Sequence, residues 1–536
     1  MTNPEIAELF SEDDDRGAAD SVRTGIVTEP AAGVDSNRPP DEIMYEQDGL
    51  PVLLDANMAK FITEKYLREK YCWSGGFGWK QWDGRVWSDS SDVAVTEEVR
   101  RAMIAYYKEE LDGVFPTGRA MALARFLQAS KIGSIARHAR GILEVDAGRF
   151  DQQPDLLNVS NGVVDLRTKE LIPHNRQFLF TKITRVPYIP GAQHADWDAA
   201  LNAVPSEVGK YLKSRFGQSI TGHPTQDDVL PFLIGGGANG KSTIMVPIQR
   251  ALGDFATVVA DRVFLANPSD HPTELTDLHG ARFALIEELP EGRHMNMTRV
   301  KKVIGTPRLS ARKINKDSMQ WDATHTLFIT TNHKPLFEDT DYGAWRRVEL
   351  VTFPFRFRMP HQPVVGPLDR HGDPNLRNRL RDGADGQHEA VLSWLIDGAS
   401  EWYANKKTMG APPREVEAAT EEWRRSADVI LGFFHDELVA DPESHIATPD
   451  LHAVFKHWLS EKDLRSWSER TLTARFAEHE VVKSHQIIAT RVRADRKRGS
   501  VLSRPSSTWM FGELKDRYTG WEGVRFRGSG ENTAEF

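Results

Sequence analysis

The chain has 536 residues, a formal net charge of −9 and 40% hydrophobic residues. A chain of this length is too long for one compact core, so we expect about two to four domains. Its single cysteine, Cys72, excludes a disulfide framework and any zinc module built from clustered cysteines, including the zinc-ribbon type of primase. The sequence predicts no membrane span and no secretory signal, and we therefore expect a cytoplasmic protein.

Negative charge is concentrated at the start of the chain. Residues 1–50 hold thirteen acidic residues and three arginines, a net charge of −10, so the other 486 residues sum to +1. An acidic segment with proline and serine but no hydrophobic periodicity is typical of disorder. We predict an acidic disordered tail over 1–45, followed by folded domains whose local basic surfaces can bind nucleic acid.

Residues 46–204 are predicted to form a mainly helical N-terminal domain. Apolar residues have helical spacing over 56–71, and further helices follow up to about Arg140. Between them, Asp83-Gly84 separates aromatic strand formers, which predicts a hairpin. Its tryptophans could stack on bases, but packing within the core of the hairpin is the favoured interpretation.

Short apolar strands alternate with helices over residues 205–405. The strands are expected at 229–234, 282–286 and 326–330. A helix is expected at 241–252, and this alternation predicts a mostly parallel sheet covered by helices on both faces. The Pro-, Gly-, Asp- and Arg-rich stretch 359–387 is interpreted as a surface insertion, and a helix over 388–403 follows it.

The strongest motif is a phosphate loop that follows the first of these strands. It fits the pattern of a glycine, four further residues and Gly-Lys-Ser, in which backbone N–H groups bind phosphates and glycines permit the close approach. We expect ATP to be bound by the whole loop: Gly235, Gly236, Gly237, Ala238, Asn239, Gly240, Lys241, Ser242 and Thr243. In this arrangement Lys241 neutralises phosphate charge and the Ser242 hydroxyl ligates Mg²⁺.

Two further strands end in polar side chains. The strand at 282–286 runs into Glu287, expected to bind Mg²⁺, and Glu288, expected to polarise the attacking water. The strand at 326–330 is followed by Asn332, whose amide can bind both the water and the γ-phosphate. The alternative interpretation is that these are strand ends with solvated acids and a turn asparagine.

Two arginines and a basic segment complete the expected site. Arg346 or Arg347 could stabilise the charge of the transferring phosphoryl group as an arginine finger, or both could lie on a solvated face. The segment 301–320 is rich in lysine and arginine and contains a turn-prone Asn-Lys-Asp, which predicts a hairpin. Arg312, Lys313 and Lys316 of this hairpin are expected to contact DNA phosphates, with a solvated basic face as the alternative.

The four motifs, in this order between residues 235 and 347, resemble those of superfamily 3 helicases, in particular the phage, plasmid and poxvirus primase–helicase family. The resemblance covers roughly residues 45–527. It also includes these positions outside the motifs: Phe150, Asp151, Asn158, Asn161, Gly162, Asp165, Trp197, Gly217, Gly222, Lys334, Pro335, Gly398, Pro412 and Pro413. It implies an AAA+-like phosphate-loop ATPase core over 205–405 and a homohexameric ring that binds ATP and Mg²⁺ between subunits.

The chain departs from the family pattern in two respects. Gly305-Thr306-Pro307 stands where the family usually has Gly-Gly-Asp, so the turn into the basic hairpin is expected to differ. Many relatives also carry a primase–polymerase domain ahead of the helicase, a place taken in this sequence by the acidic residues 1–45. We therefore expect priming to belong to a separate primase or DNA polymerase.

The last part of the sequence is expected to be a linker over 406–424, a winged-helix-like domain over 425–527 and a tail over 528–536. Ser468 is expected to cap a recognition helix. Residues 483–504 hold seven basic residues and one acid, and Arg496, Lys497 and Arg498 could form the tip of a wing that contacts DNA phosphates. The alternative is a small domain that binds protein partners.

Together these features predict an ATP-dependent DNA helicase, 3′→5′ by family resemblance, that acts on single-stranded or forked DNA in the replication of a phage or related element. Two alternatives remain open. One is a phosphate-loop ATPase that remodels or packages DNA without unwinding it. The other is a replication initiator that uses ATP only to assemble at an origin.

Overall fold

A computed structural model describes residues 51–112, 117–260, 272–289, 294–295, 297–304, 306–312, 318–337, 345–462, 464, 466–493, 500–504 and 514–528. The chain divides into residues 1–44 and 45–536, and the predicted acidic tail lies outside the described residues. None of the helices in the described ranges combines the length and the apolar character that crossing a membrane requires.

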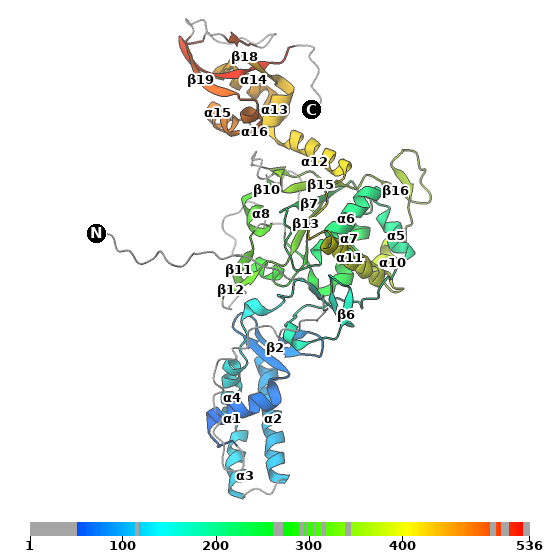
Figure 1. The fold of residues 1–536 in the computed structure, drawn as a ribbon, viewed down its shortest axis with the longest axis vertical. Coiled ribbons are helices and arrows are strands. Elements are labelled where there is room, and N and C mark those ends of the chain that lie inside the picture. The colour runs from blue at the N-terminus through cyan, green and yellow to red at the C-terminus, as the bar shows by residue number, and fades with distance from the viewer. Residues whose placement is uncertain are drawn as a thin grey trace, which may run out of the picture. The chain divides into compact units, whose positions relative to one another are not determined.

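The first described region combines helices with a small antiparallel sheet (Figure 1). Its helices are α1 (Asp55–Ile62), which continues as a π-helical turn (Thr63–Leu67), α2 (Asp92–Asp112), α3 (Thr117–Ala124) and α4 (Ala129–Ile142). Its strands are β1 (Tyr71–Ser74), β2 (Gly78–Trp82) and β3 (Trp87–Ser90). The helix expected to reach Tyr71 ends earlier, because Tyr71 pairs with Gln81 as the first residue of β1.

The predicted aromatic hairpin is confirmed. Trp82 of β2 pairs with Trp87 of β3, and Gly84 takes a φ of +99° in the turn between them. Trp79 and Trp87 are only 3% and 4% exposed. Both rings are therefore covered by the fold, as the core-packing interpretation expected, and are not free to stack on bases.

A second small sheet and two helices lead to the central region. The strands are β4 (Leu156–Val159), β5 (Gly162–Asp165) and β6 (Glu170–Ile172), and the helices are α5 (Ala195–Leu201) and α6 (Ser206–Ser219). Gly217 of α6 packs directly on Gly398 of α11 (Gln387–Ala404), where a Cβ on Gly217 would lie 2.2 Å from the Gly398 carbonyl carbon. The pair of glycines allows the two helices to approach this closely.

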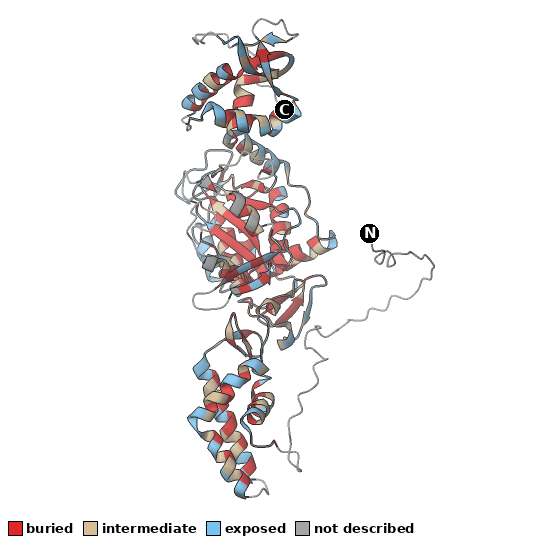
Figure 2. Ribbon diagram, turned by 90° about the vertical axis from the view of Figure 1, so that its left-hand side faces the viewer, coloured by how far each residue is buried: buried red, intermediate tan, exposed pale blue. Residues whose placement is uncertain are grey.

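The central sheet is parallel and has the strand order β15-β7-β13-β9-β8. Its strands are β7 (Leu230–Ile234), β8 (Ala256–Val258), β9 (Phe283–Glu287), β13 (Thr326–Thr331) and β15 (Val348–Thr352). Figure 2 shows that the strands of this sheet are mostly buried. The mixed α/β architecture with a parallel sheet is thus confirmed.

Each face of the sheet has its own apolar core, because alternate strand residues point to opposite faces. On one face, Leu233, Leu285 and Phe328 pack against α6, α7 (Lys241–Leu252) and α11. On the other face, Phe232 and Ile329 belong to a core that includes residues of the small elements β10 (His294–Met295), α8 (Met297–Ile304), β11 (Arg308–Arg312) and β12 (Ser318–Asp322). Strand β14 (Leu336–Phe337) pairs in parallel with β10.

The region expected to be a linker contains a helix of the central region. Helix α12 spans Arg414–Ala427, and its Trp423 ring lies 4.9 Å from the Phe232 ring and 5.4 Å from the Trp345 ring, measured between centroids. The Thr420 hydroxyl also accepts a hydrogen bond from the backbone N–H of Leu350 on β15. This segment is therefore packed against the sheet rather than free.

The segment interpreted as a surface insertion is more ordered than the sequence suggested. It carries β17 (Asp369–His371), which pairs in parallel with β16 (Arg356–Arg358), and helix α10 (Leu376–Asp382). Leu380 of α10 is fully buried in the same core as α7. A seven-residue helix escaped sequence analysis because arginine, asparagine and aspartate outnumber its two leucines.

The C-terminal region has a core of its own. It comprises α13 (Val429–Glu437), β18 (Leu438–Ala447), α14 (Thr448–Glu461), α15 (Glu469–Glu478), α16 (Glu480–Ser484), β19 (Ile488–Arg493), β20 (Val501–Leu502) and β21 (Arg517–Phe526), with sheet order β19-β21-β18-β20. The predicted cap is confirmed, because the Ser468 hydroxyl accepts a 3.1 Å hydrogen bond from the Thr471 N–H at the start of α15.

Candidate nucleotide-binding site

The order of strands in the central sheet brings three sequence motifs to one edge. Strand β13 pairs in parallel with β7 on one side and β9 on the other. The phosphate loop follows β7, Glu287 is the last residue of β9 and Glu288 follows it, and Asn332 follows β13. Since the carboxyl ends of parallel strands meet at the same edge, motifs far apart in sequence surround one cavity.

The backbone of the phosphate loop requires glycine at two positions in particular. A Cβ on Gly235 would lie 1.8 Å from the side-chain nitrogen of Asn239, so no larger residue fits. Gly240, the residue before α7, has a φ of +88° in the left-handed region that favours glycine. Helix α7 begins at Lys241, and its N-terminus therefore faces the space enclosed by the loop.

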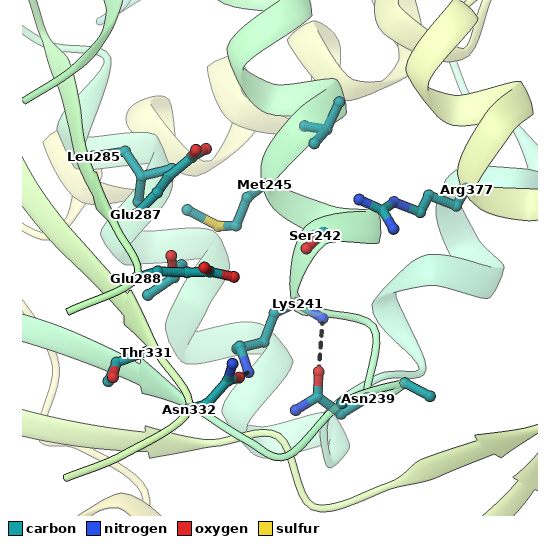
Figure 3. Close-up of a pocket in the computed structure, with 14 residues that line it drawn as sticks. Asn239, Lys241, Ser242, Met245, Leu285, Glu287, Glu288, Thr331, Asn332 and Arg377 are labelled. Carbon is teal, nitrogen blue, oxygen red and sulfur yellow. Dashed lines mark hydrogen bonds between the residues drawn. The ribbon is translucent and has the colours of Figure 1, made fainter. Parts of the chain in front are cut away.

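A cavity of about 600 Å³ lies against this helix N-terminus (Figure 3). Five loop residues line it, together with residues from β9, β13 and two helices. The lining residues are Gly237, Ala238, Asn239, Lys241, Ser242, Met245, Val246, Leu285, Glu287, Glu288, Thr330, Thr331, Asn332 and Arg377. Gly235, Gly236, Gly240 and Thr243 are not among them, although all four belong to the predicted loop.

Lys241 is held between the loop and the neighbouring strand. Its ammonium donates a 2.9 Å hydrogen bond to Oδ1 of Asn332 and another to the carbonyl of Gly235. Burial lowers the pKa of Lys241, and the nearby carboxylate of Glu288 opposes that shift. The structure thus brings the predicted lysine, acid and asparagine into one site.

The two carboxylates differ in their surroundings. Oε1 of Glu287 accepts a 3.3 Å hydrogen bond from the side chain of Gln249 on α7. Glu288 has a φ of +52°, and its N–H donates to the carbonyl of Thr330. A non-glycine residue in this conformation is uncommon and costs energy, and such positions are often found at functional sites.

The donor set fits a magnesium–nucleotide complex. Within the described residues, no group of three or more His, Cys, Asp and Glu side chains could hold a metal ion. Mg²⁺ bound with a nucleotide needs fewer protein ligands, because phosphates and water fill most of its coordination positions. Ser242 and Glu287 both line the cavity and are the residues that would hold such an ion, polarising the phosphate to be transferred.

The two arginines of the predicted finger lie in different environments, and neither lines the cavity. Arg347 is partly buried and pairs with Asp228 at 3.4 Å, while its backbone carbonyl accepts a hydrogen bond from the Leu230 N–H. Arg346 is exposed. The two arginines, which the sequence could not tell apart as candidate fingers, therefore differ: Arg347 is held in an ion pair and Arg346 is exposed.

Most of the predicted DNA contacts fall outside the described residues: Lys313, Lys316, Arg496, Lys497 and Arg498. Arg312 ends β11, which pairs in antiparallel register with β12 and brings Arg312 opposite Ser318. The predicted hairpin is thereby confirmed in its two strands. Its base is anchored, because Met319 and Trp321 are buried in the core.

Sequence analysis missed several residues of the cavity, above all Arg377 of α10. The spacing of Leu376 and Leu380 is the one signal of this helix, since residues four apart share a face. Thr330 and Thr331 also line the cavity, and neither is among the site residues that the sequence predicts. The Thr331 hydroxyl donates to the carbonyl of His333, which shapes the turn that carries Asn332.

Comparisons with known proteins find matches to two parts of the chain. Residues 59–204 match the family described as D5 N terminal like, and residues 233–347 match a family of unknown function, DUF5906. A protein of African swine fever virus (strain Badajoz 1971 Vero-adapted) with the provisional name primase C962R is 25% identical over 310 residues, 55% of this chain and 32% of that protein. Primase D5 of fowlpox virus (strain NVSL) is 22% identical over 259 residues, 44% of this chain and 32% of the relative.

A protein of frog virus 3 (isolate Goorha) with the provisional name helicase 022R is 24% identical over 261 residues, 47% of this chain and 26% of that protein. The matches thus cover about a third or less of each of these relatives. The solved C-terminal region of NrS-1 shares 11% identity over 58% of this chain and 75% of that one, with a TM-score of 0.33, and no conclusion rests on this likeness.

These relatives are viral proteins named as primases or helicases. The D5 N terminal like match and these relatives support the resemblance to the phage, plasmid and poxvirus primase–helicase family that the motifs indicated.

Proposed function

We propose that this protein is an ATP-dependent DNA helicase that works as a homohexameric ring in the replication of a phage or related element. The observation that carries the proposal is the meeting of Lys241, Glu288 and Asn332 in one cavity at the carboxyl edge of a parallel sheet. This arrangement matches what nucleoside triphosphate hydrolysis requires: a phosphate-binding loop, an acid to activate water and a polar side chain to orient it.

In this proposal the AAA+-like core spans residues 205–405. Phosphates bind to the backbone N–H groups at the N-terminus of α7, and Lys241 neutralises their charge. Glu288 accepts a proton from the attacking water, which Asn332 orients. Mg²⁺, held by Ser242 and Glu287, supplies electrostatic stabilisation of the transferring phosphate.

The proposed assembly into a hexamer is supported by the position of the finger arginines, which do not line the cavity of their own subunit. Arg346 is exposed and does not line the cavity, so a neighbouring subunit is the natural source of this charge. Arg347 is engaged by Asp228 and supports the segment instead. Hydrolysis would then depend on assembly, as in other oligomeric ATPases with a finger supplied in trans.

Two elements are proposed to contact DNA. The hairpin of β11 and β12 joins the central core through its buried Met319 and Trp321, which would transmit movements of the core to its basic tip. The C-terminal region over 425–527 is proposed to be a winged-helix-like domain, supported by its separate core and by the capped helix α15. In the proposed domain organisation, a separate N-terminal domain spans residues 46–204.

The test is unwinding of a forked duplex by the purified full chain in the presence of ATP and Mg²⁺, with Lys241→Ala as the inactive control. The proposal expects strand displacement by the wild type, none by the variant, and a hexamer in solution with nucleotide and single-stranded DNA. ATP hydrolysis without strand displacement would contradict the helicase assignment and favour a remodelling or packaging ATPase. Origin binding without unwinding would favour an initiator.

A further inference from the structure

Arg377 lies on the side of the cavity away from the catalytic acids. In Figure 3 its guanidinium is directed from α10 toward Ser242, whereas Glu288 and Asn332 lie on the other side of Ser242. The cavity therefore has acidic and amide groups at one side, the helix N-terminus with Lys241 in the middle, and a second cation opposite the acids. The roles proposed above leave this cation without a function.

The helix that carries Arg377 is fixed to its surroundings at several points. The Arg379 guanidinium donates hydrogen bonds of 2.9 and 2.6 Å to the carboxylate of Asp196 on α5. Leu380 is fully buried, and its carbonyl is 2.8 Å from the ring nitrogen Nε2 of His388 on α11. Helix α10 is thus held against α5 and α11, so the fold sets the backbone position of Arg377, whose side chain is exposed.

Arg377 also differs from the other arginines of its helix in its partners. Arg379 pairs with Asp196 and Asp373, and Arg381 pairs with its neighbour Asp382. In the described part of the chain, Arg377 has no acidic partner. A cation on a fixed helix that faces a phosphate-binding loop is available for an anion, and the planar fork of arginine matches two phosphate oxygens.

We propose that Arg377 binds the phosphate chain of the nucleotide within its own subunit, on the side remote from Glu288, where it contacts the phosphates that ATP and ADP share. This inference rests on the proposed nucleotide hydrolysis and adds a residue that binds without taking part in the chemical step. Because the contact is equal in the ground state and the transition state, it lowers KM and leaves kcat unchanged.

The test compares Arg377→Ala with Arg381→Ala in the full chain. Arg381 lies one turn further along α10, does not line the cavity and is equally charged, so its replacement controls for charge and for the helix itself. Titration with ADP and with a non-hydrolysable ATP analogue should show affinity for both falling about tenfold in Arg377→Ala and remaining unchanged in Arg381→Ala. An unchanged melting temperature should accompany the loss.

Kinetics provide the second measurement. Arg377→Ala should raise KM for ATP about tenfold with kcat within about a factor of two of the wild type. Unchanged affinities, or a fall in kcat at unchanged KM, would overturn the inference while leaving the proposed hydrolysis intact. Failure of the wild type to bind any nucleotide would instead overturn the proposed function, and this inference with it.

Mixed assemblies test whether the contact lies within one subunit. At saturating ATP Arg377→Ala is expected to be active, so the mixture is assayed at low ATP, where the higher KM limits the rate. No subunit of an Arg377→Ala and Lys241→Ala mixture has both residues, so its rate should not exceed that of its Arg377→Ala subunits alone. A faster rate would mean that Arg377 serves the neighbour's nucleotide, contrary to the inference.

Discussion

The ammonium of Lys241 donates a 2.9 Å hydrogen bond to Oδ1 of Asn332, and so joins the start of α7 to the end of β13. The two residues are far apart in sequence and meet because β13 lies directly beside β7. A phosphate bound in the loop would compete for the same ammonium. Binding of nucleotide and the position of the asparagine are therefore coupled in the proposed mechanism.

Replacement of Lys241 by alanine should abolish ATP hydrolysis, because the loop loses its lysine and Asn332 loses its partner. The measurement is steady-state phosphate release, with Lys210→Ala as the control, since Lys210 is an exposed residue paired with Glu207. A turnover number like that of the wild type in Lys241→Ala would remove the basis of the proposed site.

Glu288→Gln should bind ATP with affinity near that of the wild type yet hydrolyse it about 100-fold more slowly or worse. The amide keeps the size of the side chain but cannot take a proton from water, and the proposed Mg²⁺ ligands Ser242 and Glu287 are retained. Nucleotide affinity and single-turnover hydrolysis are the paired measurements, with the exposed Glu207→Gln as control. Hydrolysis at the normal rate would exclude Glu288 as the base.

Arg346→Ala and Arg347→Ala should both lose ATPase activity, but for different reasons. Arg346→Ala should bind ATP but hydrolyse it about 1,000-fold more slowly. It should recover part of its ATPase activity when mixed with Lys241→Ala, because at some interfaces one subunit then supplies an intact phosphate loop and its neighbour an intact Arg346. Arg347→Ala should act through the fold, and Asp228→Asn should reproduce its effect, since these two residues pair.

Mixed assemblies of verified composition that recover no ATPase with Arg346→Ala would argue against a finger in trans. If Arg347→Ala recovers in the mixture and Arg346→Ala does not, the two roles are exchanged. The thermal unfolding midpoint should fall in Arg347→Ala and in Asp228→Asn but not in Arg346→Ala, whose side chain is exposed.

Lys316→Ala should impair unwinding and DNA-stimulated ATPase far more than basal ATPase. Lys316 lies between β11 and β12, the paired strands of the basic hairpin, and is expected to contact backbone phosphate. Its loss should weaken binding to all DNA sequences alike. The slope of log affinity against log salt concentration should fall in magnitude by about 1, as expected for one lost phosphate contact. Normal unwinding by the variant at raised salt would contradict a role for the hairpin in DNA contact.

Stability should fall as the pH drops from about 6.5 to about 4 because of His325. Burial lowers the pKa of His325 from 6.5 to about 4. The folded pKa is the lower one, so between these values the unfolded chain binds more protons, and the free energy of unfolding decreases with falling pH by about 3 kcal/mol at most.

The thermal unfolding midpoint measured across this pH range should fall less steeply in His325→Gln, which cannot titrate. His371→Gln is the matched control, because His371 is exposed on β17. Since the pKa of the buried His279 is also lowered to about 4, part of the slope should remain in His325→Gln. An identical slope in His325→Gln and the wild type would contradict the assignment.

Features that depend only on neighbouring residues could be predicted from the sequence. The spacing of glycines before Lys241 predicts a loop that binds phosphate, Asp83-Gly84 predicts a tight turn, and Ser468 predicts a helix cap. Each of these depends on backbone geometry and on contacts within a few residues, so the local pattern is sufficient.

Which of these features meet depends on long-range packing. The sequence gives the strands in chain order, but only long-range packing inserts β13 between β7 and β9 and so brings Asn332 to Lys241. It likewise pairs Arg347 with Asp228 and turns Arg377 toward the phosphate loop from a helix with little sequence signal. Contacts of this kind depend on which apolar surfaces cover one another across the whole chain, and no short window of residues encodes that choice.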